Sequence, residues 1–482
     1  MKYKYVVLTN TTIGSFMSQL DSNIVLISLP TIIRDLPGTT TIDAIWVIMG
    51  YLLVSATLLL TFGRLADIYG RVKLFNLGFA VFTVGSALCS VAPTGGSLVL
   101  FRLIQGVGGA LIFSNNAAIL TDTFPPGERG RAIGMNQVLG ISGSVVGLVG
   151  GGVLTAALGW RSIFWINVPV GVFATSWAYK KLKELAKTRK EPLDPLGNGL
   201  FAIGLSVFLI GLTLGAISGY TWTETLMMIS GLAMLVLFVY VETKVRSPMM
   251  DVSLFKIKAF SSGMISNFLG SLARGAVSLL FVFYFQGALL LDALTAGILI
   301  IPFSIAFISF GPLSGYLSDK YGARSFSTGG LVISAVASLW FAFLPANVSY
   351  DIFVLPMILI GIGAGMFVAP NIASIMNASP VSRRGIAAGM SSTMITTGFL
   401  LSMGIAFVML ATSMPTSTLE AIFAGLPIAA NELNLNLFMG AIHKIFLLLA
   451  VINVIAAVTS SLRGPKPIGQ QALRVSTEHG LG

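Results

Sequence analysis

Charged residues are scarce in this chain. Only 10% of its 482 residues are Asp, Glu, Lys or Arg, whereas soluble globular chains carry about 25%. Hydrophobic residues make up 55%, and the mean hydropathy is +0.89. So few charges cannot form a water-facing surface over a core of this size, which excludes an ordinary cytosolic enzyme. The apolar content also excludes a disordered chain.

Cysteine and histidine are nearly absent. Cys89 stands alone, which excludes a disulfide framework and a thiolate metal site. The histidines are His443 and His479, so one chain cannot build a multi-histidine metal centre. The G-x-x-x-x-G-K-[ST] phosphate loop is also missing, and ATP-driven transport is not indicated. We therefore predict no metal, no cofactor and no catalytic residues.

Long apolar runs take the place of these features. A membrane-spanning helix needs about 20 predominantly apolar residues. Such runs lie at 7–33, 45–62, 74–92, 97–120, 132–158, 163–179, 197–217, 225–241, 260–288, 292–315, 327–345, 352–376, 386–411 and 437–462. They predict an all-α membrane protein with 14 transmembrane helices and no separate soluble domain.

The basic residues predict how this chain is oriented. Most of the 29 Lys and Arg residues fall in loops on one side of the predicted spans, including the basic run 180–190. By the positive-inside rule this side is cytoplasmic. We therefore expect a multi-pass protein of the cell membrane with both termini in the cytoplasm. The net charge of +11 then reflects topology and contact with the lipid bilayer, and no nucleic-acid partner is expected.

Two loop sequences occur twice in the chain. GRLADIYGR (63–71) is echoed by GYLSDKYGAR (315–324), and RGRAIGM (129–135) by RGIAAGM (384–390). Matched loops at nearly one offset predict two homologous six-helix halves. Parallel repeats of this kind are a transporter architecture with the substrate site between the halves.

The repeat and the spans together predict the domain boundaries. We expect an N-terminal six-helix bundle over 1–179, a basic cytoplasmic linker over 180–196, two inserted transmembrane helices over 197–241, a cytoplasmic linker over 242–259, a C-terminal six-helix bundle over 260–463 and a cytoplasmic tail over 464–482.

Five segments resemble a known family. They are LDSNIVLISLP (20–30), GRLADIYGRVK (63–73), RLIQGVGGA (102–110), GSVVGLVGGG (143–152) and WRSIFWINVPVG (160–171). In these segments the chain resembles the major facilitator superfamily, and within it the fourteen-helix drug:proton antiporter branch (EmrB/QacA-like). The resemblance covers almost the whole chain. It implies a major facilitator fold and proton-coupled efflux of small amphipathic compounds by alternating access, with protons and a small-molecule substrate as partners. We expect a monomer.

Asp21 is the first candidate for proton coupling or substrate binding. It lies near the centre of its span, where a carboxylate is costly, so it is expected to face a cavity or a partner. Gly14, Ser18, Val25 and Ser28 share its helical face, which predicts the lining of a water-filled pathway. The family resemblance implicates this Asp in protonation and substrate binding. The alternative is a structural ion pair.

Arg102 is the second candidate for proton coupling. An arginine inside a span is costly, so its side chain is expected to point inward, toward a carboxylate, a carbonyl or water. Arg102 shares a helical stripe with Gln105 and Asn116, and the resemblance ties it to proton coupling. The alternative is an arginine that extends to the outer headgroups.

Arg274 is outside the family pattern. It lies near the centre of its span, where it favours an anionic or neutral substrate or neutralises Asp21. The alternative is a helix kink at which the guanidinium binds backbone carbonyls. Gln286, in the FYFQGALL stretch, joins the candidate substrate-binding residues by resemblance.

The repeated loops carry a candidate conformational latch. The resemblance implies that the loop joins the two halves on the cytoplasmic face, and the alternative is a loop that only sets topology. The latch residues are Gly63, Asp67, Gly70, Arg71, Gly315, Asp319, Gly322 and Arg324. A further motif places Gly143, Gly147, Gly150 and Gly151 on one small-residue face for close helix packing. The family has Pro where Leu148 stands here.

Three functions are compatible with these residues. The first is proton-coupled efflux of amphipathic compounds or drugs. The second is transport of a neutral or anionic metabolite on the same fold, which Arg274 and Leu148 favour. The third is a non-transporting membrane receptor or a lipid-handling protein.

Overall fold

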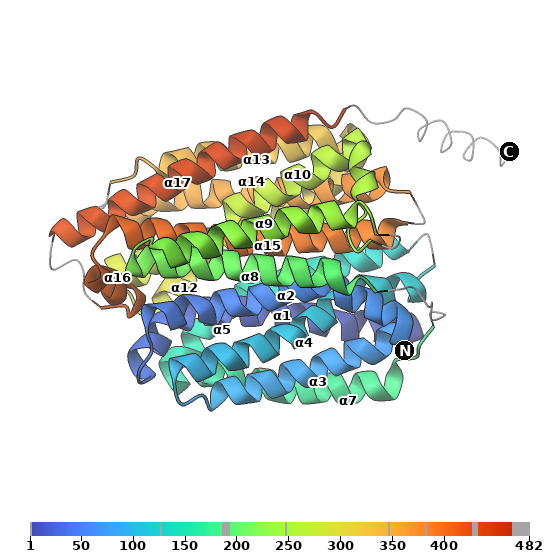
Figure 1. Cartoon of the computed structure of the whole chain (residues 1–482), viewed down its shortest axis with the longest axis horizontal. Coiled ribbons are helices and arrows are strands. Elements are labelled where there is room, and N and C mark those ends of the chain that lie inside the picture. Colours follow the sequence, from blue (N-terminus) through green and yellow to red (C-terminus); the bar gives the residue numbers. More distant parts are fainter. Residues whose placement is uncertain are drawn as a thin grey trace.

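The chain folds into a bundle of long helices, which a computed structural model describes over residues 2–125, 128–185, 193–245, 248–345, 348–380, 383–426 and 432–464 (Figure 1). The predicted tail 464–482 lies almost wholly outside the described residues, as does part of the predicted linker 180–196.

The first helices in the chain form one packed group. Their bounds are α1 (Tyr3–Asp35), α2 (Thr41–Tyr69), α3 (Arg71–Ser90), α4 (Gly95–Thr123), α5 (Arg129–Leu158), α6 (Ser162–Trp165) and α7 (Asn167–Lys181). Helix α1 packs on α5, α4 packs on α2 and α3, and α3 packs on α7. We call α1–α7 the N-terminal set.

A hairpin of two helices follows, and then a second group. The hairpin is α8 (Pro195–Ser218) and α9 (Trp222–Glu242). The second group is the 3₁₀-helix η1 (Val252–Lys256), α10 (Lys258–Arg274), α11 (Val277–Val282), the π-helix η2 (Phe283–Ala288), α12 (Ala293–Tyr321), α13 (Ala323–Phe341), α14 (Tyr350–Ala378), α15 (Arg384–Ser413), α16 (Thr416–Phe423) and α17 (Glu432–Ser461). We call α10–α17 the C-terminal set. Within it α14 packs on α12 and α13, and α10 packs on α15 and α17.

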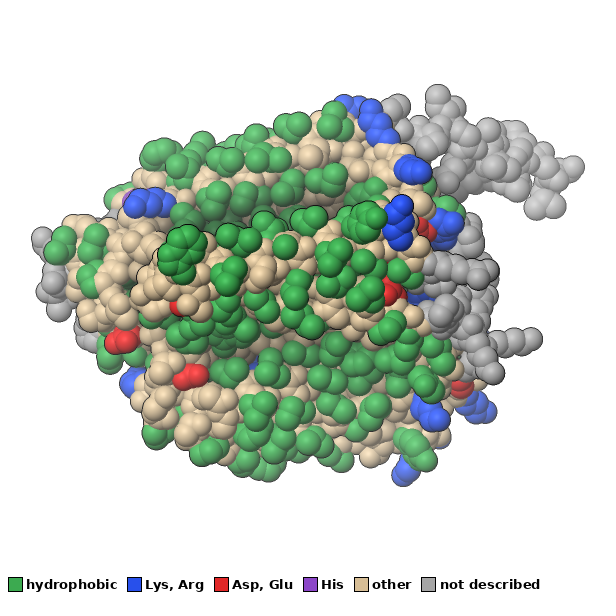
Figure 2. Space-filling view, viewed as in Figure 1, with side chains coloured by type: hydrophobic (Ala, Val, Ile, Leu, Met, Phe, Trp, Pro, Cys, Tyr) green, Lys and Arg blue, Asp and Glu red, His purple; other side chains and the backbone are tan. Residues whose placement is uncertain are grey.

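The outside of the bundle is apolar. Among the described residues, 11 helices are long and apolar enough to cross a membrane. Leu, Val and Ile side chains cover the visible face (Figure 2), and Trp222 is 90% exposed on α9. A surface of this kind is stable against lipid and not against water.

The two ends of the bundle differ in charge. One end carries Arg71, Lys183, Lys256, Lys320 and Arg383, in loops or at the ends of helices. Most of the visible Lys and Arg side chains gather there (Figure 2). We call this the basic end and the opposite one the far end. Three helices start at the far end with reciprocal side-chain caps, namely α2 at Thr40, α4 at Thr94 and α9 at Thr221.

A sharp turn is repeated at the basic end. Gly70 joins α2 to α3 with φ 109°, and Gly322 joins α12 to α13 with φ 93°. Side chains disfavour these φ values, so glycine is required at both positions. The equivalent loops identified in the sequence therefore have the same backbone form.

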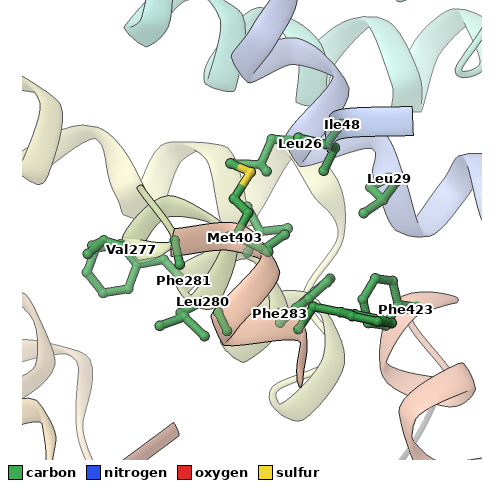
Figure 3. Close-up of a cluster of buried hydrophobic side chains, with 14 of the residues drawn as sticks. Leu26, Leu29, Ile48, Val277, Leu280, Phe281, Phe283, Met403 and Phe423 are labelled. Atoms are coloured by element: carbon green, nitrogen blue, oxygen red, sulfur yellow. The ribbon is translucent and has the colours of Figure 1, made fainter. Parts of the chain in front are cut away.

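The two sets share buried apolar contacts at the far end. One cluster joins Leu26, Leu29 and Ile48 of the N-terminal set to Leu280, Phe283 and other residues of the C-terminal set (Figure 3). Toward the basic end the buried clusters are separate, one within the N-terminal set around Phe75 and Phe79 and another around Phe260 and Met264. We call the shared cluster the far-end seal.

Small residues let α1 and α5 approach closely. A Cβ on Gly143 would lie 2.5 Å from the Phe16 carbonyl oxygen, and one on Gly147 would lie 2.6 Å from that of Leu20. Gly151 likewise faces α1. The prediction was wrong for Gly150, whose Cβ would meet only Val146 of its own helix at 3.9 Å. Adjacent residues point about 100° apart on a helix, which turns Gly150 off the face that Gly151 presents.

This contact predicts opposite outcomes for two substitutions of neighbouring glycines. Gly147→Ala should lower the stability by about 1–3 kcal/mol, because the added methyl overpacks the α1–α5 contact. Gly150→Ala should leave the melting temperature unchanged within error or raise it slightly. Thermal unfolding of both purified variants in detergent measures the difference. Equal melting temperatures would show that α1 and α5 do not pack in this way.

Candidate functional site

Asp21 lies at the centre of a buried polar network in the N-terminal set. Its side chain, on α1, is fully inaccessible to solvent. Its Oδ2 is 2.5 Å from Arg102 Nη1. Its Oδ1 accepts hydrogen bonds from Gln105 Nε2 at 2.8 Å and from Asn167 Nδ2 at 2.9 Å. The carboxylate thus has one ion pair and two amide donors.

Arg102, the ion-pair partner of Asp21, is also buried and hydrogen-bonded to several groups. It lies on α4 and is 1% exposed. Its Nε donates to the Val47 carbonyl oxygen on α2 at 2.9 Å, and its Nη1 also donates to Gln105 Oε1 at 2.5 Å. The guanidinium lies over the ring of Tyr51, 4.5 Å from its centroid. A cation over an aromatic face is stabilised further by about 0.5–2 kcal/mol.

Gln105 completes the network. Its Nε2 donates to Ser86 Oγ on α3 at 2.7 Å as well as to Asp21. Five helices therefore meet at this point, namely α1, α2, α3, α4 and α7. We call Asp21, Arg102, Gln105, Asn167 and Ser86 the Asp21 network. Two charges at this depth are tolerated only when they are paired and hydrogen-bonded, and the network supplies both conditions.

The structure decides between two alternatives for Arg102. The side chain points into the bundle and does not extend to the headgroups. The expectation of a water-filled pathway along the Asp21 face of α1 is wrong for this conformation, since Ser18, Val25 and Ser28 are fully buried. Protein groups occupy that face instead. Ser28 bonds Thr155 at 2.7 Å, and a Cβ on Gly14 would lie 2.8 Å from Ile112.

Two other predicted residues lie apart from the network. Asn116 donates to the Thr11 carbonyl oxygen at 3.0 Å and to Ser15, nearer the basic end. Gln286 donates to the Ile27 carbonyl oxygen at 2.8 Å. This second bond joins η2 of the C-terminal set to α1 of the N-terminal set beside the far-end seal.

Arg274 lies at a break between α10 and α11. At this break Ser402 of α15 accepts the Ala276 backbone N–H at 2.9 Å. The guanidinium lies between the rings of Phe307 on α12 and Phe399 on α15, 5.6 and 5.2 Å from their centroids. Within the described part of the chain, Arg274 has no carboxylate in salt-bridge range. It does not neutralise Asp21, which is paired with Arg102.

Arg71, at the end of the first repeated loop, forms its ion pairs within the N-terminal set. Arg71 donates to Asp67 at 2.8 and 3.0 Å and to Asp122 of α4 at 2.7 and 2.8 Å. Glu184 accepts the Val72 N–H at 2.9 Å at the start of α3. Asp67 therefore binds Arg71 of its own loop, and no bond in the described part of the chain joins Asp67 to the C-terminal set.

The other latch residues behave differently. Gly63 has no close neighbour, and Arg324 is exposed on α13. A Cβ on Gly315 would meet only Ala369, at 3.6 Å. The side chain of Asp319 lies outside the described residues.

Sequence reasoning missed Asn167, Ser86 and Asp122 as site residues. Asn167 lies in the WRSIFWINVPVG segment and was visible as a polar residue inside an apolar run. Ser86 gives no such signal, because serine is common in membrane helices and its role depends on the contact between α3 and α4.

Comparison with known proteins now identifies the class. The features above define an all-α, multi-pass membrane protein with two packed helix sets. The Major Facilitator Superfamily model matches residues 11–250 and 263–474. The chain belongs to this superfamily and is a secondary transporter, not an enzyme.

Relatives and solved structures agree with this assignment. The chain is 32% identical to the riboflavin transporter RibZ of Clostridioides difficile, over 83% of this chain and 87% of that protein. It is 29% identical to multidrug resistance protein 3 of Bacillus subtilis, over 88% and 82%. A bacterial homologue of the lysosomal transporter Spinster, solved in an inward-facing conformation, has the same fold with a TM-score of 0.65, 16% identity and coverage of 96% and 97%.

The Asp21 network predicts a large coupling energy between its two charges. Asp21→Asn and Arg102→Gln should each lower the stability by about 3–5 kcal/mol, because each leaves a buried charge without its partner. The double variant should lose less than the sum, since its two single losses share one cause. Thermal unfolding of the purified variants gives the cycle. The matched control is Asp35→Asn in the exposed Arg34–Asp35 pair, which should change stability by less than about 1 kcal/mol. Additive losses at Asp21 and Arg102 would contradict the geometry.

Proposed function

We propose that this protein exports small amphipathic compounds across the cell membrane by proton-coupled alternating access. In this proposal it is a member of the fourteen-helix drug:proton antiporter branch. Two six-helix bundles, 1–179 and 260–463, move relative to each other around a substrate site between them. The inserted pair 197–241 is carried alongside.

The helix lengths support the count of 14 spans. Among the described residues, 11 helices are long and apolar enough to cross a membrane. Three further helices bring the count to 14. They are α5 with 30 residues, α7 with 15 and α13 with 19. Each is enclosed by or packed against other spans, so it needs less apolar surface than a lone membrane helix.

The charge distribution supports the orientation. The basic end carries the loops rich in Lys and Arg, and positive loops stay on the cytoplasmic side. The proposal therefore places the basic end and both termini in the cytoplasm and the far end outside the cell.

The far-end seal is the observation that carries the proposal. The shared cluster closes the space between the two sets at one end. At the other end one cluster lies within the N-terminal set, and the other joins the C-terminal set to the α8–α9 hairpin. A transporter that alternates must have one end closed at a time. In this orientation the outer end is closed, and the proposal has substrate enter from the cytoplasm. That is the conformation from which an exporter loads.

Asp21 is the proposed coupling group. Protonation removes the charge that Arg102, Gln105 and Asn167 bind, so it weakens a joint of five helices. Asp21 is fully buried here, so protons reach it in another conformation of the cycle. A difference of one pH unit supplies about 1.4 kcal/mol per proton, which sustains up to about tenfold accumulation.

The relatives guide the choice of substrate. Multidrug resistance protein 3 and the tetracenomycin C resistance and export protein of Streptomyces glaucescens, which is 29% identical over 83% of this chain and 74% of that protein, are export or resistance proteins by name. Their similarity supports export of bulky organic compounds.

Arg274 supports a second candidate, transport of a neutral or anionic metabolite. Arg274 is flanked by α12 and α15. Both helices contact the N-terminal set, since α12 packs on α5 and α15 packs on α2. A guanidinium between two rings on that side suits a flat molecule with oxygen acceptors. The riboflavin transporter RibZ is the relative whose named substrate has this chemistry.

Flux in proteoliposomes tests both candidates. Purified protein should accumulate ethidium or riboflavin against its gradient when a pH difference is imposed, and Asp21→Asn should reduce the accumulation at least tenfold. Counterflow exchange should persist in Asp21→Asn, which shows that the variant is folded. Arg274→Gln should impair riboflavin transport and spare ethidium if the second candidate holds. Full accumulation by Asp21→Asn would remove Asp21 from the coupling.

A further inference from the structure

Two buried carboxylates face each other at the base of the α8–α9 hairpin. Asp194 precedes α8 and is 6% exposed, and Glu242 ends α9 and is 2% exposed. Neither belongs to the Asp21 network or to the repeated loops. Both lie at the basic end of the molecule.

Each carboxylate uses one oxygen and leaves the other without a partner. Asp194 Oδ1 caps α8 by accepting the Gly197 N–H at 2.8 Å. Glu242 Oε2 accepts the Met250 N–H at 2.9 Å. Among the described residues, Asp194 Oδ2 and Glu242 Oε1 accept no hydrogen bond. A buried oxygen that carries charge without a partner is strongly destabilising.

The two free oxygens converge on one point. A Cβ on Gly197 would lie 2.6 Å from Asp194 Oδ2 and 2.7 Å from Glu242 Oε1. The small space above Gly197 is therefore bounded by both oxygens. Gly199, two residues further along α8, faces open space.

Among the described residues, neither Asp194 nor Glu242 forms a salt bridge. Within the described residues, the charges that act on Glu242 are Asp194 and Arg64 at the end of α2. Arg64 donates to the Pro248 carbonyl oxygen at 3.0 Å. The next acidic residue in the chain, Asp251, is paired with Arg383 at 2.6 Å.

We infer that Asp194 and Glu242 bind one proton between them. Two carboxylates that share a small buried site cannot both ionise, so one stays protonated and donates to the other. A shared proton gives both free oxygens a hydrogen bond. The described residues contain no third Asp, Glu, His or Cys close enough to complete a metal site, which favours a proton over a divalent cation.

The position of this site gives the proton a role. Arg64 of the N-terminal set holds Pro248, and two residues later Met250 donates to Glu242. Loss of the proton leaves two negative charges, which attract Arg64 toward the hairpin. The pair therefore makes the contact between α2 and the α8–α9 hairpin sensitive to pH. This site is distinct from the proposed coupling group, and its test requires no transport.

The pH dependence of stability tests the proton site. Near neutral pH the folded pair keeps one proton, whereas the unfolded carboxyl groups have already lost theirs, since they ionise near pH 4. Wild-type stability should therefore fall as the pH rises. The contribution of one proton is up to about a tenfold change in the unfolding constant per pH unit. Glu242→Gln and Asp194→Asn each replace the shared proton with an amide donor. Thermal unfolding in nanodiscs from pH 5.5 to 8.5 should therefore show a flatter profile for both variants than for wild type.

A matched glycine pair and added cations complete the experiment. Gly197→Ala puts a methyl group between the oxygens and should flatten the profile in the same way, whereas Gly199→Ala should keep the wild-type profile. Profiles of Glu242→Gln and Asp194→Asn that run parallel to wild type would overturn the inference. So would stabilisation of wild type alone by Na⁺, K⁺ or Mg²⁺ at pH 8, because that result would make the ligand a metal cation.

Discussion

The ion pair between Asp21 and Arg102 is the constraint on which the N-terminal set depends. Its two charges are removed from water and from lipid headgroups, so every remaining donor and acceptor near them must be satisfied. The chain meets this demand with groups from five helices. The pair therefore determines how α1, α2, α3, α4 and α7 are positioned.

The far-end seal and the Asp21 network differ in how easily they can rearrange. The far-end seal is apolar and non-directional, so it can separate and re-form without leaving unpaired polar groups, apart from the Gln286 bond to Ile27. The Asp21 network is polar and directional, so it has few alternative arrangements. The far-end seal can therefore open while the Asp21 network keeps the N-terminal set rigid. This combination suits rigid-body rocking of two bundles. The π-helix η2 and the break at Arg274 lie on the C-terminal side of the far-end seal.

Sequence patterns predicted much of this fold for identifiable reasons. Apolar runs indicated the spans because each span must cross the same thickness of hydrocarbon. The repeated loops were recognisable because Gly70 and Gly322 have a backbone conformation that favours glycine. The inward direction of Arg102 followed from the cost of an isolated charge in lipid, whereas its pairing with Asp21 was one of several open alternatives. The partners Ser86, Asn167 and Asp122 were not predictable, because ordinary polar residues gain their roles only from helix contacts. The same limit explains Gly150, whose direction depends on the helix phase, and Arg71, whose second partner Asp122 lies on α4.

The prediction of a water-filled pathway along the Asp21 face was wrong for this conformation, and the reason is physical. Spacing placed Gly14, Ser18 and Ser28 with Asp21, but a small polar face suits tight packing against another helix as well as contact with water. The structure resolves this in favour of packing, with Ile112 and Thr155 filling the space.

The most direct test of this account is the distance between the two sets at each end of the molecule. Spin labels at Pro93 and Ser349 report the far end, and labels at Lys73 and Arg324 report the basic end, with Cys89 replaced by Ala. Pulsed electron resonance on the wild type should give a short far-end distance. Asp21→Asn should add a longer far-end population and a shorter basic-end population, because loss of the charge loosens the network that favours the closed outer end. Distances that stay unchanged in Asp21→Asn, or that lengthen together at both ends, would contradict the link between Asp21 and alternating access.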